Sequence, residues 1–417
     1  MSDATNNPAP LNLSRLQALP MLLMILGGAL SLFGLFNVTQ LGFCWLFAFV
    51  FYYTIALGAL FLVLVHHLTD AGWSVGIRRF CEHLASLLGW PLVAMFLPVA
   101  LLAPKIYSWM TVSPEEHLIA ARAPVFTKPG FYVTSAIFLG LLWFLTSRLS
   151  RLSLQQDKTG AAALTHKMRF HAGWGIVVFG LTLTFGAALW VKALQYQWYS
   201  AMYGVYFFGS SVWVGLATVY VLAAILQRQR YLAGVVQPVH YYYLGVLLMG
   251  FTLFQAYIEF AQYFVVWNAN MPVETFWYLL RERGSWWTVS MILIFGHFFL
   301  PFFILLPAKV KSNVKVIVPL CFWVWIMHAL DLAFNIFPAE NQYHVGDESY
   351  PDGFPLRWIW LPLATLAFQG GFLAYFFLVK LHRHPKYPQK DPRLLEAMGV
   401  NPHLANELAG QNPEATQ

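Results

Sequence analysis

Glu259 is the residue whose type and position point most directly to chemistry. It is a carboxylic acid inside a long apolar run, residues 240–267. An ionisable side chain at membrane depth costs roughly 3 kcal/mol or more on insertion, so its presence there indicates a function. His297, His328 and Asp331 lie in the next two apolar runs and repeat the pattern. We therefore expect this chain to move protons, or to handle a substrate that carries them.

Glu259 belongs to a polar stripe on its helix. The spacing i, i+4, i+7 and i+8 places four polar side chains on one helical face: Gln255, Glu259, Gln262 and Tyr263. Such a stripe cannot face lipid and must face a protein interior or a cavity. Gln255, Gln262 and Tyr263 are therefore candidates to line a quinone pocket or a proton path beside Glu259.

The other candidate residues are expected at a similar depth. At the rise of an α-helix, Glu259 lies roughly 10 Å below the outer end of its helix. His328 and Asp331 stand one turn apart in a helix that runs the same way, about 12 and 8 Å below its outer end. Side chains at this spacing can form a hydrogen-bonded imidazole–carboxylate couple. His297 lies near the middle of the helix between these two.

Proton transfer is the chemistry that suits this set. Burial favours the protonated form of a carboxylic acid unless a cation or a hydrogen-bond donor stabilises the charged form. Such a buried acid is a suitable proton acceptor near neutral pH. Quinol oxidation releases two electrons and two protons, and each proton needs a base within hydrogen-bond reach. The alternative is that these side chains only join helices by hydrogen bonds, each worth about 0.6 kcal/mol.

A second group lies at the opposite end of the second apolar run. His66, His67 and Asp70 follow one another closely there and are candidates for proton uptake from the cytoplasm. The alternative is a helix end in the headgroup zone, where charge is tolerated.

No bound redox centre or metal is expected in this chain. Cys44, Cys81 and Cys321 are scattered, which excludes a C-x-x-C-H haem attachment and argues against a cysteine-held iron–sulfur cluster. His297 and His328 are the one plausible pair for a haem, but no predicted helix carries two well-separated central histidines. A metal site is not predicted either.

These residues must be positioned by membrane helices. Hydrophobic residues make up 59% of the 417 positions and charged residues 10%, which no soluble class matches. The sequence predicts an all-α integral membrane protein with ten spanning helices, each near the 20 residues that a bilayer requires. The predicted spans are 17–37, 41–67, 84–104, 130–148, 171–193, 204–227, 239–266, 285–308, 314–336 and 356–381.

The distribution of lysine and arginine predicts the orientation. With the N-terminus in the cytoplasm, the inner segments hold 18 of the 25 basic residues, so both termini are expected to be cytoplasmic. The excess of basic over acidic residues then reflects the membrane topology and an attraction to anionic lipid, and not nucleic-acid binding. We expect an N-terminal segment 1–16, a transmembrane domain 17–381 and an extended, proline-rich cytoplasmic tail 382–417.

Four stretches carry a resemblance to a known family. They are YIEFAQYFVVWNANMPVETFWYLLRERGSWW at 257–287, FGHFFLPF at 295–302, LDLAFNIFP at 330–338 and VHHLTDAGWSVGIRR at 65–79. With the length and the order of helices, they resemble the F subunit of bacterial alternative complex III, its smaller multi-pass quinol subunit. This family is similar to the membrane subunits of polysulfide-reductase and nitrite-reductase type enzymes.

The resemblance implies an architecture and a set of partners. It implies two four-helix bundles, helices 2–5 and 6–9, flanked by helices 1 and 10, in the bacterial cytoplasmic (inner) membrane. Haem and iron–sulfur clusters would belong to partner subunits: a larger homologous multi-pass quinol subunit, an iron–sulfur subunit and multihaem cytochrome c subunits. This chain would lack a redox centre and serve a quinol:cytochrome c oxidoreductase complex through a quinol-facing or proton-conducting path.

Two other classes of function remain open. The chain could be a purely structural membrane anchor for extrinsic redox subunits, with its buried polar groups serving only packing. It could also be a proton-coupled secondary transporter, which paired, discontinuous helices would favour. The prolines of this sequence are scattered and not paired.

Overall fold

The computed structural model describes residues 13–112, 117–122, 124–340, 342–345, 348–351, 353 and 356–399. In this part of the chain, ten helical segments are long and apolar enough to span a membrane, as predicted. The protein is therefore a multi-pass membrane protein. Most of the predicted N-terminal segment and residues 400–417 of the predicted tail lie outside the described residues.

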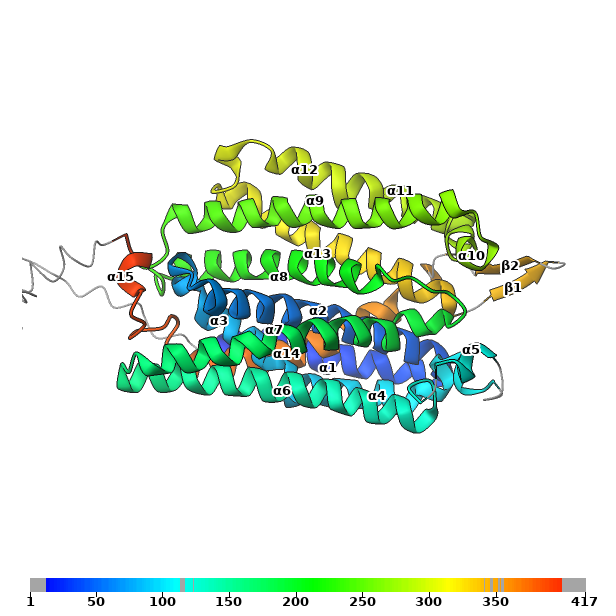
Figure 1. Cartoon of the computed structure of the whole chain (residues 1–417), viewed down its shortest axis with the longest axis horizontal. Coiled ribbons are helices and arrows are strands. Elements are labelled where there is room, and N and C mark those ends of the chain that lie inside the picture. Colours follow the sequence, from blue (N-terminus) through cyan, green and yellow to red (C-terminus); the bar gives the residue numbers. More distant parts are fainter. Residues whose placement is uncertain are drawn as a thin grey trace, which may run out of the picture.

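The spanning segments lie side by side along the long axis of the molecule, with α9, α11 and α12 at one edge and α6 at the other (Figure 1). Their helices are α1 (Leu13–Phe33), α2 (Val38–Thr69), α3 (Val75–Ala85), α4 (Trp90–Ile106), α6 (Lys128–Thr159), α7 (Ala163–Trp190), α8 (Tyr203–Arg228), α9 (Pro238–Ala269), α11 (Gly284–Ile292), α12 (Leu300–Leu305), α13 (Val314–Ile336) and α14 (Trp360–Arg383). Shorter elements at the two ends are α5 (His117–Ala120), α10 (Pro272–Arg281), β1 (Gln342–Val345), β2 (Glu348–Pro351) and α15 (Leu394–Ala397).

Helix α2 is the centre of the molecule. It packs against α3, α4, α7, α8, α13 and α14, and most of its side chains are buried. The crossing of α2 and α8 is close because Gly58 faces Gly215: a Cβ on Gly58 would lie 2.1 Å from the carbonyl oxygen of Ser211. Small residues allow backbones to approach in this way in membrane proteins. Helix α8 also packs on α9 and α13, whereas α1 packs on α14.

The third span begins earlier than the predicted range 84–104. It contains α3 and α4, which meet at a break around Gly89. Arg78, Arg79 and Glu82 lower the hydropathy of α3, yet all three are buried inside the molecule. The hydropathy pattern alone therefore places the start of this span too late.

The eighth span is interrupted by a π-helical segment, Leu293–Phe299, between α11 and α12. A π-turn leaves carbonyl groups without their usual α-helical partners, and such turns occur often at functional sites. Here Trp323 Nε1 of α13 donates a hydrogen bond of 2.8 Å to the carbonyl oxygen of Gly296. This segment carries His297.

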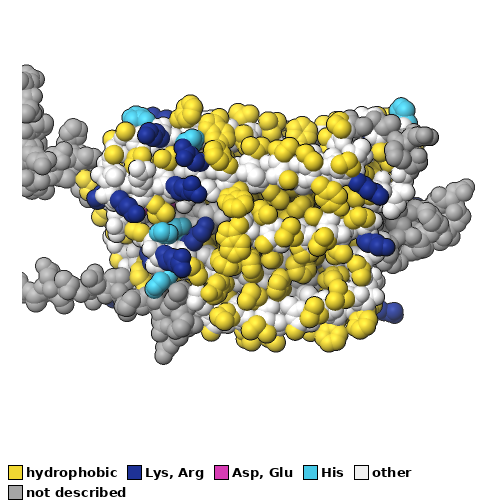
Figure 2. Space-filling model, turned by 90° about the horizontal axis from the view of Figure 1, so that it is seen from below, with side chains coloured by type: hydrophobic (Ala, Val, Ile, Leu, Met, Phe, Trp, Pro, Cys, Tyr) yellow, Lys and Arg dark blue, Asp and Glu magenta, His cyan; other side chains and the backbone are white. Residues whose placement is uncertain are grey.

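The two ends of the helical body differ. The end that carries α10 and the antiparallel β1–β2 hairpin is here named the hairpin end, and the end that carries α15 is named the tail end (Figure 1). Figure 2 shows hydrophobic side chains over the middle of one face, and most of that face's Lys, Arg and His side chains near the tail end.

The described part of the predicted tail lies against the helical body. Gln389 N donates to Asp157 Oδ1 of α6 at 3.0 Å, and Gln237 Nε2, just before α9, donates to the carbonyl oxygen of Met398 at 2.6 Å. Ala397 of α15 is buried. Residues 384–399 therefore form a strap across the tail end.

Candidate functional site

Three of the predicted residues meet in the hairpin-end half of the molecule. Glu259 of α9, His297 of the π-helical segment and Asp331 of α13 each offer one nitrogen or oxygen atom, and these atoms all lie within 4.8 Å of one another. Together with His328, they are named the carboxylate cluster below. Helix periodicity predicted the polar faces of the helices that carry Glu259 and Asp331. The packing of α9 and α13 on α8, and of the π-helical segment on α9 and α13, brings the three residues together.

Asp331 is held by neutral donors. Tyr206 Oη of α8 donates to its carboxylate, with both oxygens at 2.5 Å. Asn335 Nδ2, one turn further along α13, donates to Tyr206 Oη at 2.7 Å and lies 3.3 Å from Asp331 Oδ1. Tyr203 Oη in turn donates to Asn335 Oδ1 at 3.2 Å. A chain of hydroxyl and amide groups thus leads from Asp331 toward the hairpin end.

Glu259 is half-buried and is the most accessible member of the cluster. Gln255 Nε2, one turn earlier, donates to Glu259 Oε1 at 2.8 Å. The Gln255 side chain is fully buried against Gly209 of α8, where a Cβ would lie 2.4 Å from Gln255 Oε1. Gly209 therefore provides the space in which Gln255 reaches the cluster.

The two carboxylates constrain each other. Two ionised carboxylates at this separation repel strongly, so the pair favours holding a proton or a cation between them. The set of two carboxylates and one imidazole is also one that several divalent metals accept, although the sequence predicted no metal site. The arrangement can therefore take up and release a positive charge.

His328 does not form the predicted couple with Asp331. Its Nε2 lies 2.8 Å from Thr54 Oγ1 of α2, and its Nδ1 lies 2.9 Å from Ser210 Oγ of α8. Thr54 donates its own hydrogen to the carbonyl oxygen of Phe51, so Nε2 is assigned as the protonated nitrogen and Nδ1 as the acceptor. The direct couple that the spacing allows is not formed, because Thr54 of α2 and Ser210 of α8 bond both ring nitrogens.

His297 is buried without such partners. Neither of its ring nitrogens forms a hydrogen bond with any residue that the structure describes. Its ring lies against the indole of Trp213, with the two ring centroids 4.1 Å apart. An imidazole held by ring contact, with free nitrogens beside two carboxylates, is positioned to exchange a proton with them.

Arg281 of α10 closes the hairpin end of the site. It is fully buried, and its guanidinium lies 3.5 Å from the centroid of the Trp277 ring. It donates to the carbonyl oxygens of Phe334 at 2.8 Å and Asn335 at 3.1 Å, the latter next to the Asp331 hydrogen-bond chain. Burial lowers the pKa of Arg281 to about 9, so it remains charged at neutral pH.

The other members of the predicted stripe are not all in the site. Gln262 is buried on the same helix. Tyr263 is 41% exposed, and its hydroxyl donates to Glu282 Oε1 at 3.2 Å, away from the cluster. Of Gln255, Gln262 and Tyr263, Gln255 is therefore the residue that bonds a carboxylate of the cluster.

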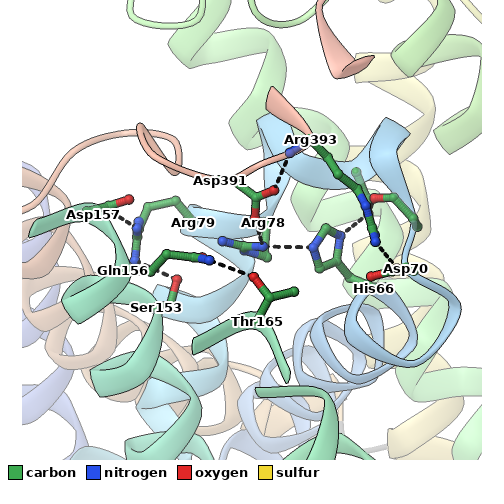
Figure 3. A network of polar contacts seen from close by, with 12 residues as sticks. His66, Asp70, Arg78, Arg79, Ser153, Gln156, Asp157, Thr165, Asp391 and Arg393 are labelled. Carbon is green, nitrogen blue, oxygen red and sulfur yellow. Dashed lines mark hydrogen bonds and ion pairs between the residues drawn. The ribbon is translucent and has the colours of Figure 1, made fainter. Parts of the chain in front are cut away.

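Two residues of the second predicted group, His66 and Asp70, lie at the tail end in a network of hydrogen bonds and ion pairs (Figure 3). Arg78 Nη1 donates to His66 Nε2 at 2.8 Å, and Ser74 Oγ lies 2.6 Å from His66 Nδ1. His67 is buried, with its ring against that of His66. Asp70 pairs with Arg169 and Arg393.

The centre of this network consists of arginines paired with carboxylates. Arg78 Nη1 lies 2.5 Å from Asp391 Oδ2 of the strap, and Arg78 Nε lies 3.1 Å from Glu82 Oε1. Arg79 Nη1 donates to Glu82 Oε2 at 2.9 Å, and Arg79 also pairs with Asp157. The arginine network comprises Asp70, Arg78, Arg79, Glu82, Asp157, Arg169, Asp391 and Arg393.

The structure does not bring the two predicted groups together. Phe61 of α2, Phe208 of α8 and Phe251 of α9 form a layer of rings between them, with Phe61 5.0 Å from Phe208 and 6.3 Å from Phe251 between centroids. Phe251 and Glu259 lie on the same helix, and eight residues of α-helix correspond to about 12 Å.

Sequence reasoning did not single out several residues that complete the cluster. They are Thr54, Tyr206, Ser210, Arg281 and Asn335. Tyr206 and Ser210 lie one turn apart on α8, so they share a helix face, and this spacing is the sequence signal that could have identified them.

Comparison with known proteins does not assign this chain. No protein-family model matches the sequence, and no curated protein is significantly similar to it.

Proposed function

We propose that this chain is a membrane subunit of a quinol-oxidising respiratory complex, in which the carboxylate cluster accepts and passes on protons. The observation that carries the proposal is the meeting of Glu259, His297 and Asp331 within 4.8 Å inside the membrane body. Their partners Gln255, Tyr206 and Asn335 are neutral, and neither acid forms an ion pair with a cation among the described residues.

The geometry suggests a direction for the protons. Glu259 is half-buried and accessible from the edge of the helical body, beside exposed Phe260 and Phe264. A quinol hydroxyl at that edge would give its proton to Glu259, from which Asp331 and His297 are one transfer away. The chain of Tyr206, Asn335 and Tyr203 then offers an exit toward the hairpin end.

The proposed orientation has the tail end in the cytoplasm of a bacterium. The gathering of basic side chains near the tail end in Figure 2 supports it through the positive-inside rule. The proposed arrangement has two helical bundles. The contacts of α2 with α4 and α7, of α6 with α7, and of α8 with α9 and α13 are consistent with the grouping.

Electrons would leave through partner subunits that hold haem and iron–sulfur centres. This follows from the resemblance of residues 257–287 and 330–338 to the alternative complex III subunit and from the scattered cysteines, which are all buried. The final acceptor would be cytochrome c or another periplasmic carrier.

The test is quinol turnover and proton release by the purified complex. Glu259→Gln and Asp331→Asn should each lower turnover about 100-fold, the usual contribution of a positioned proton acceptor, while the complex still assembles. Glu282→Gln is the matched control, because Glu282 bonds Tyr263 outside the cluster. Wild-type turnover and proton release in both cluster variants would overturn the proposal and leave a membrane anchor.

A further inference from the structure

The carboxylate cluster brings together three side chains of the kinds that bind metal ions. Glu259 comes from α9, His297 from the π-helical segment and Asp331 from α13, and one nitrogen or oxygen atom of each lies within 4.8 Å of the other two. Proteins bind zinc through imidazole nitrogens and carboxylate oxygens at about 2.0–2.2 Å, so neighbouring ligand atoms of a tetrahedral site lie about 3.3 Å apart. The limit of 4.8 Å is about 1.5 Å above that spacing.

His297 supplies the observation that points to a bound ion. Its side chain is 2% exposed, and neither ring nitrogen forms a hydrogen bond with any residue that the structure describes. A buried polar atom without a partner is costly. Because the ring stays unbonded beside two carboxylates, a cation between the three groups would satisfy one of its nitrogens and both acids at once.

The ring of His297 is held in place by packing. It lies against the indole of Trp213 with the centroids 4.1 Å apart, and Trp213 Nε1 donates a hydrogen bond of 2.8 Å to Thr252 Oγ1 of α9. A ligand that is already positioned loses little conformational freedom when it binds. Glu259 has a longer side chain and is half-buried, so it is the ligand that can move to close the remaining distance.

Charge favours a divalent ion. Neither acid forms an ion pair with a cation among the described residues. Arg281, at the hairpin end of the site, donates to carbonyl oxygens instead. Two carboxylates match the charge of one divalent ion, and a neutral set of groups is the least costly form inside a membrane body.

The donor atoms select the kind of metal. Magnesium and calcium take oxygen ligands, whereas imidazole suits zinc and the neighbouring transition metals. One imidazole and two carboxylates also make three protein ligands, the number that zinc sites with an open fourth position use.

We propose that Glu259, His297 and Asp331 form a binding site for a divalent transition metal, with zinc as the ion whose preferred ligands they match. A metal ion and a transferred proton take the same lone pairs, so bound zinc would block the proton path through the cluster. That block rests on the proposed function, whereas the metal site rests on the donor atoms alone.

Zinc binding to the full-length protein, purified with its partners in lipid nanodiscs and without a polyhistidine tag, tests the site. The probe is zinc chloride at a set free concentration, and bound zinc is counted by mass spectrometry after equilibrium dialysis. X-ray absorption at the zinc edge should show one imidazole and oxygen ligands at about 2.0–2.2 Å. Displacement of the zinc by an equal concentration of magnesium would contradict the imidazole ligand and overturn the assignment.

Variants localise the bound zinc. His297→Phe keeps a ring against Trp213 and removes both nitrogens, whereas Glu259→Gln and Asp331→Asn keep the shape and remove the charge. Each variant should weaken zinc binding at least as much as loss of a residue that supports a metal ligand, roughly 10–100-fold. Because the three changes are independent, a variant that fails to fold leaves the other two to decide. Zinc affinity that is unchanged in the folded cluster variants would overturn the inference.

Two matched controls lie outside the cluster. His171→Phe removes a histidine of α7 whose Nδ1 accepts from Trp174, and Glu282→Gln removes an acid that bonds Tyr263. Both variants should bind zinc with the affinity of the unmodified protein. An equal loss in these controls and in the cluster variants would show that the zinc is held elsewhere and would overturn the site.

Failure of this inference differs from failure of the proposed function. Zinc should inhibit quinol turnover at the free concentration that half-fills the site. A protein that binds no zinc at the cluster, but whose turnover depends on Glu259 and Asp331, removes the metal site alone. Turnover that continues unchanged when zinc fills the cluster supports the metal site and removes the proton role.

Discussion

The carboxylate cluster and the arginine network are both buried and each is built from several helices, yet they stabilise their acids in opposite ways. Asp331 and Glu259 accept hydrogen bonds from tyrosine, asparagine and glutamine. Glu82 and Asp157 each form an ion pair with an arginine. An ion pair commits both partners to their charged forms, whereas neutral donors allow an acid to gain and lose a proton. Burial alone therefore does not make a proton acceptor; the acid must also be free of an ion pair, as Glu259 and Asp331 are among the described residues.

Removal of an arginine from the network should cause the largest change. Arg79→Gln leaves Glu82 and Asp157 without this cation, and breaking a buried ion pair costs about 3–5 kcal/mol. We expect a marked drop in the thermal unfolding temperature in detergent, with normal turnover for the protein that remains folded.

Arg151→Gln on α6 is the control for that variant, because Arg151 is exposed. An unchanged unfolding temperature for Arg79→Gln, or a folded protein that loses turnover, would contradict a purely structural role of the network.

Adding a cation to the carboxylate cluster should pair its acid with a charge, as in the arginine network. Gln255→Lys places an ammonium group one turn from Glu259 and holds that carboxylate in an ion pair. Quinol turnover should then fall about 100-fold because the acceptor is lost, while assembly is retained. Gln262→Lys, on the same helix but further along, should have a smaller effect, and equal turnover in the two variants would argue against the importance of the neutral partner.

Tyr206→Phe tests the strongest neutral contact. It removes a donor that lies 2.5 Å from both oxygens of Asp331, and hydrogen bonds to charged groups contribute about 1.5–3 kcal/mol. Turnover should fall about tenfold and the pH dependence of the rate should change. Tyr203→Phe acts two residues further along the hydrogen-bond chain, beyond Asn335, and should change both quantities less. The reverse order would disprove the proposed exit.

Asp70→Asn should have the smallest effect. Asp70 is partly exposed, and surface ion pairs contribute about 0–1 kcal/mol. The unfolding temperature should change little, whereas limited proteolysis of the strap at residues 384–399 should become faster, because Arg393 loses its partner. High salt should produce the same acceleration in the wild-type protein. An unaltered proteolysis rate would show that this pair does not hold the strap.

The sequence predicted the cluster better than the network for a physical reason. Glu259 and Asp331 stand out against apolar helices, and helical spacing gives the face on which they lie. Tyr206, Ser210 and Thr54 do not stand out, because hydroxyl side chains are common in membrane helices, and the sequence does not state which helices pair. The positions of the spans were predicted well for the same reason: apolar length is a local property.

The network depends on properties that are not local. Arg78 and Arg79 precede the predicted third span, 84–104, but α3 buries them because Glu82, Asp157 and Asp391 supply the opposite charge. Asp391 lies 313 residues from Arg78 in the chain, a separation that neither periodicity nor composition reveals.

That separation has a consequence for how the protein is made. The ribosome must synthesise nearly the whole chain before Asp391 exists, so Arg78 enters the bilayer with Glu82 as its sole early counter-ion from α3. The tail end can reach its final arrangement only after translation passes the strap. Chains truncated before Asp391 would therefore keep a buried positive charge partly unmatched.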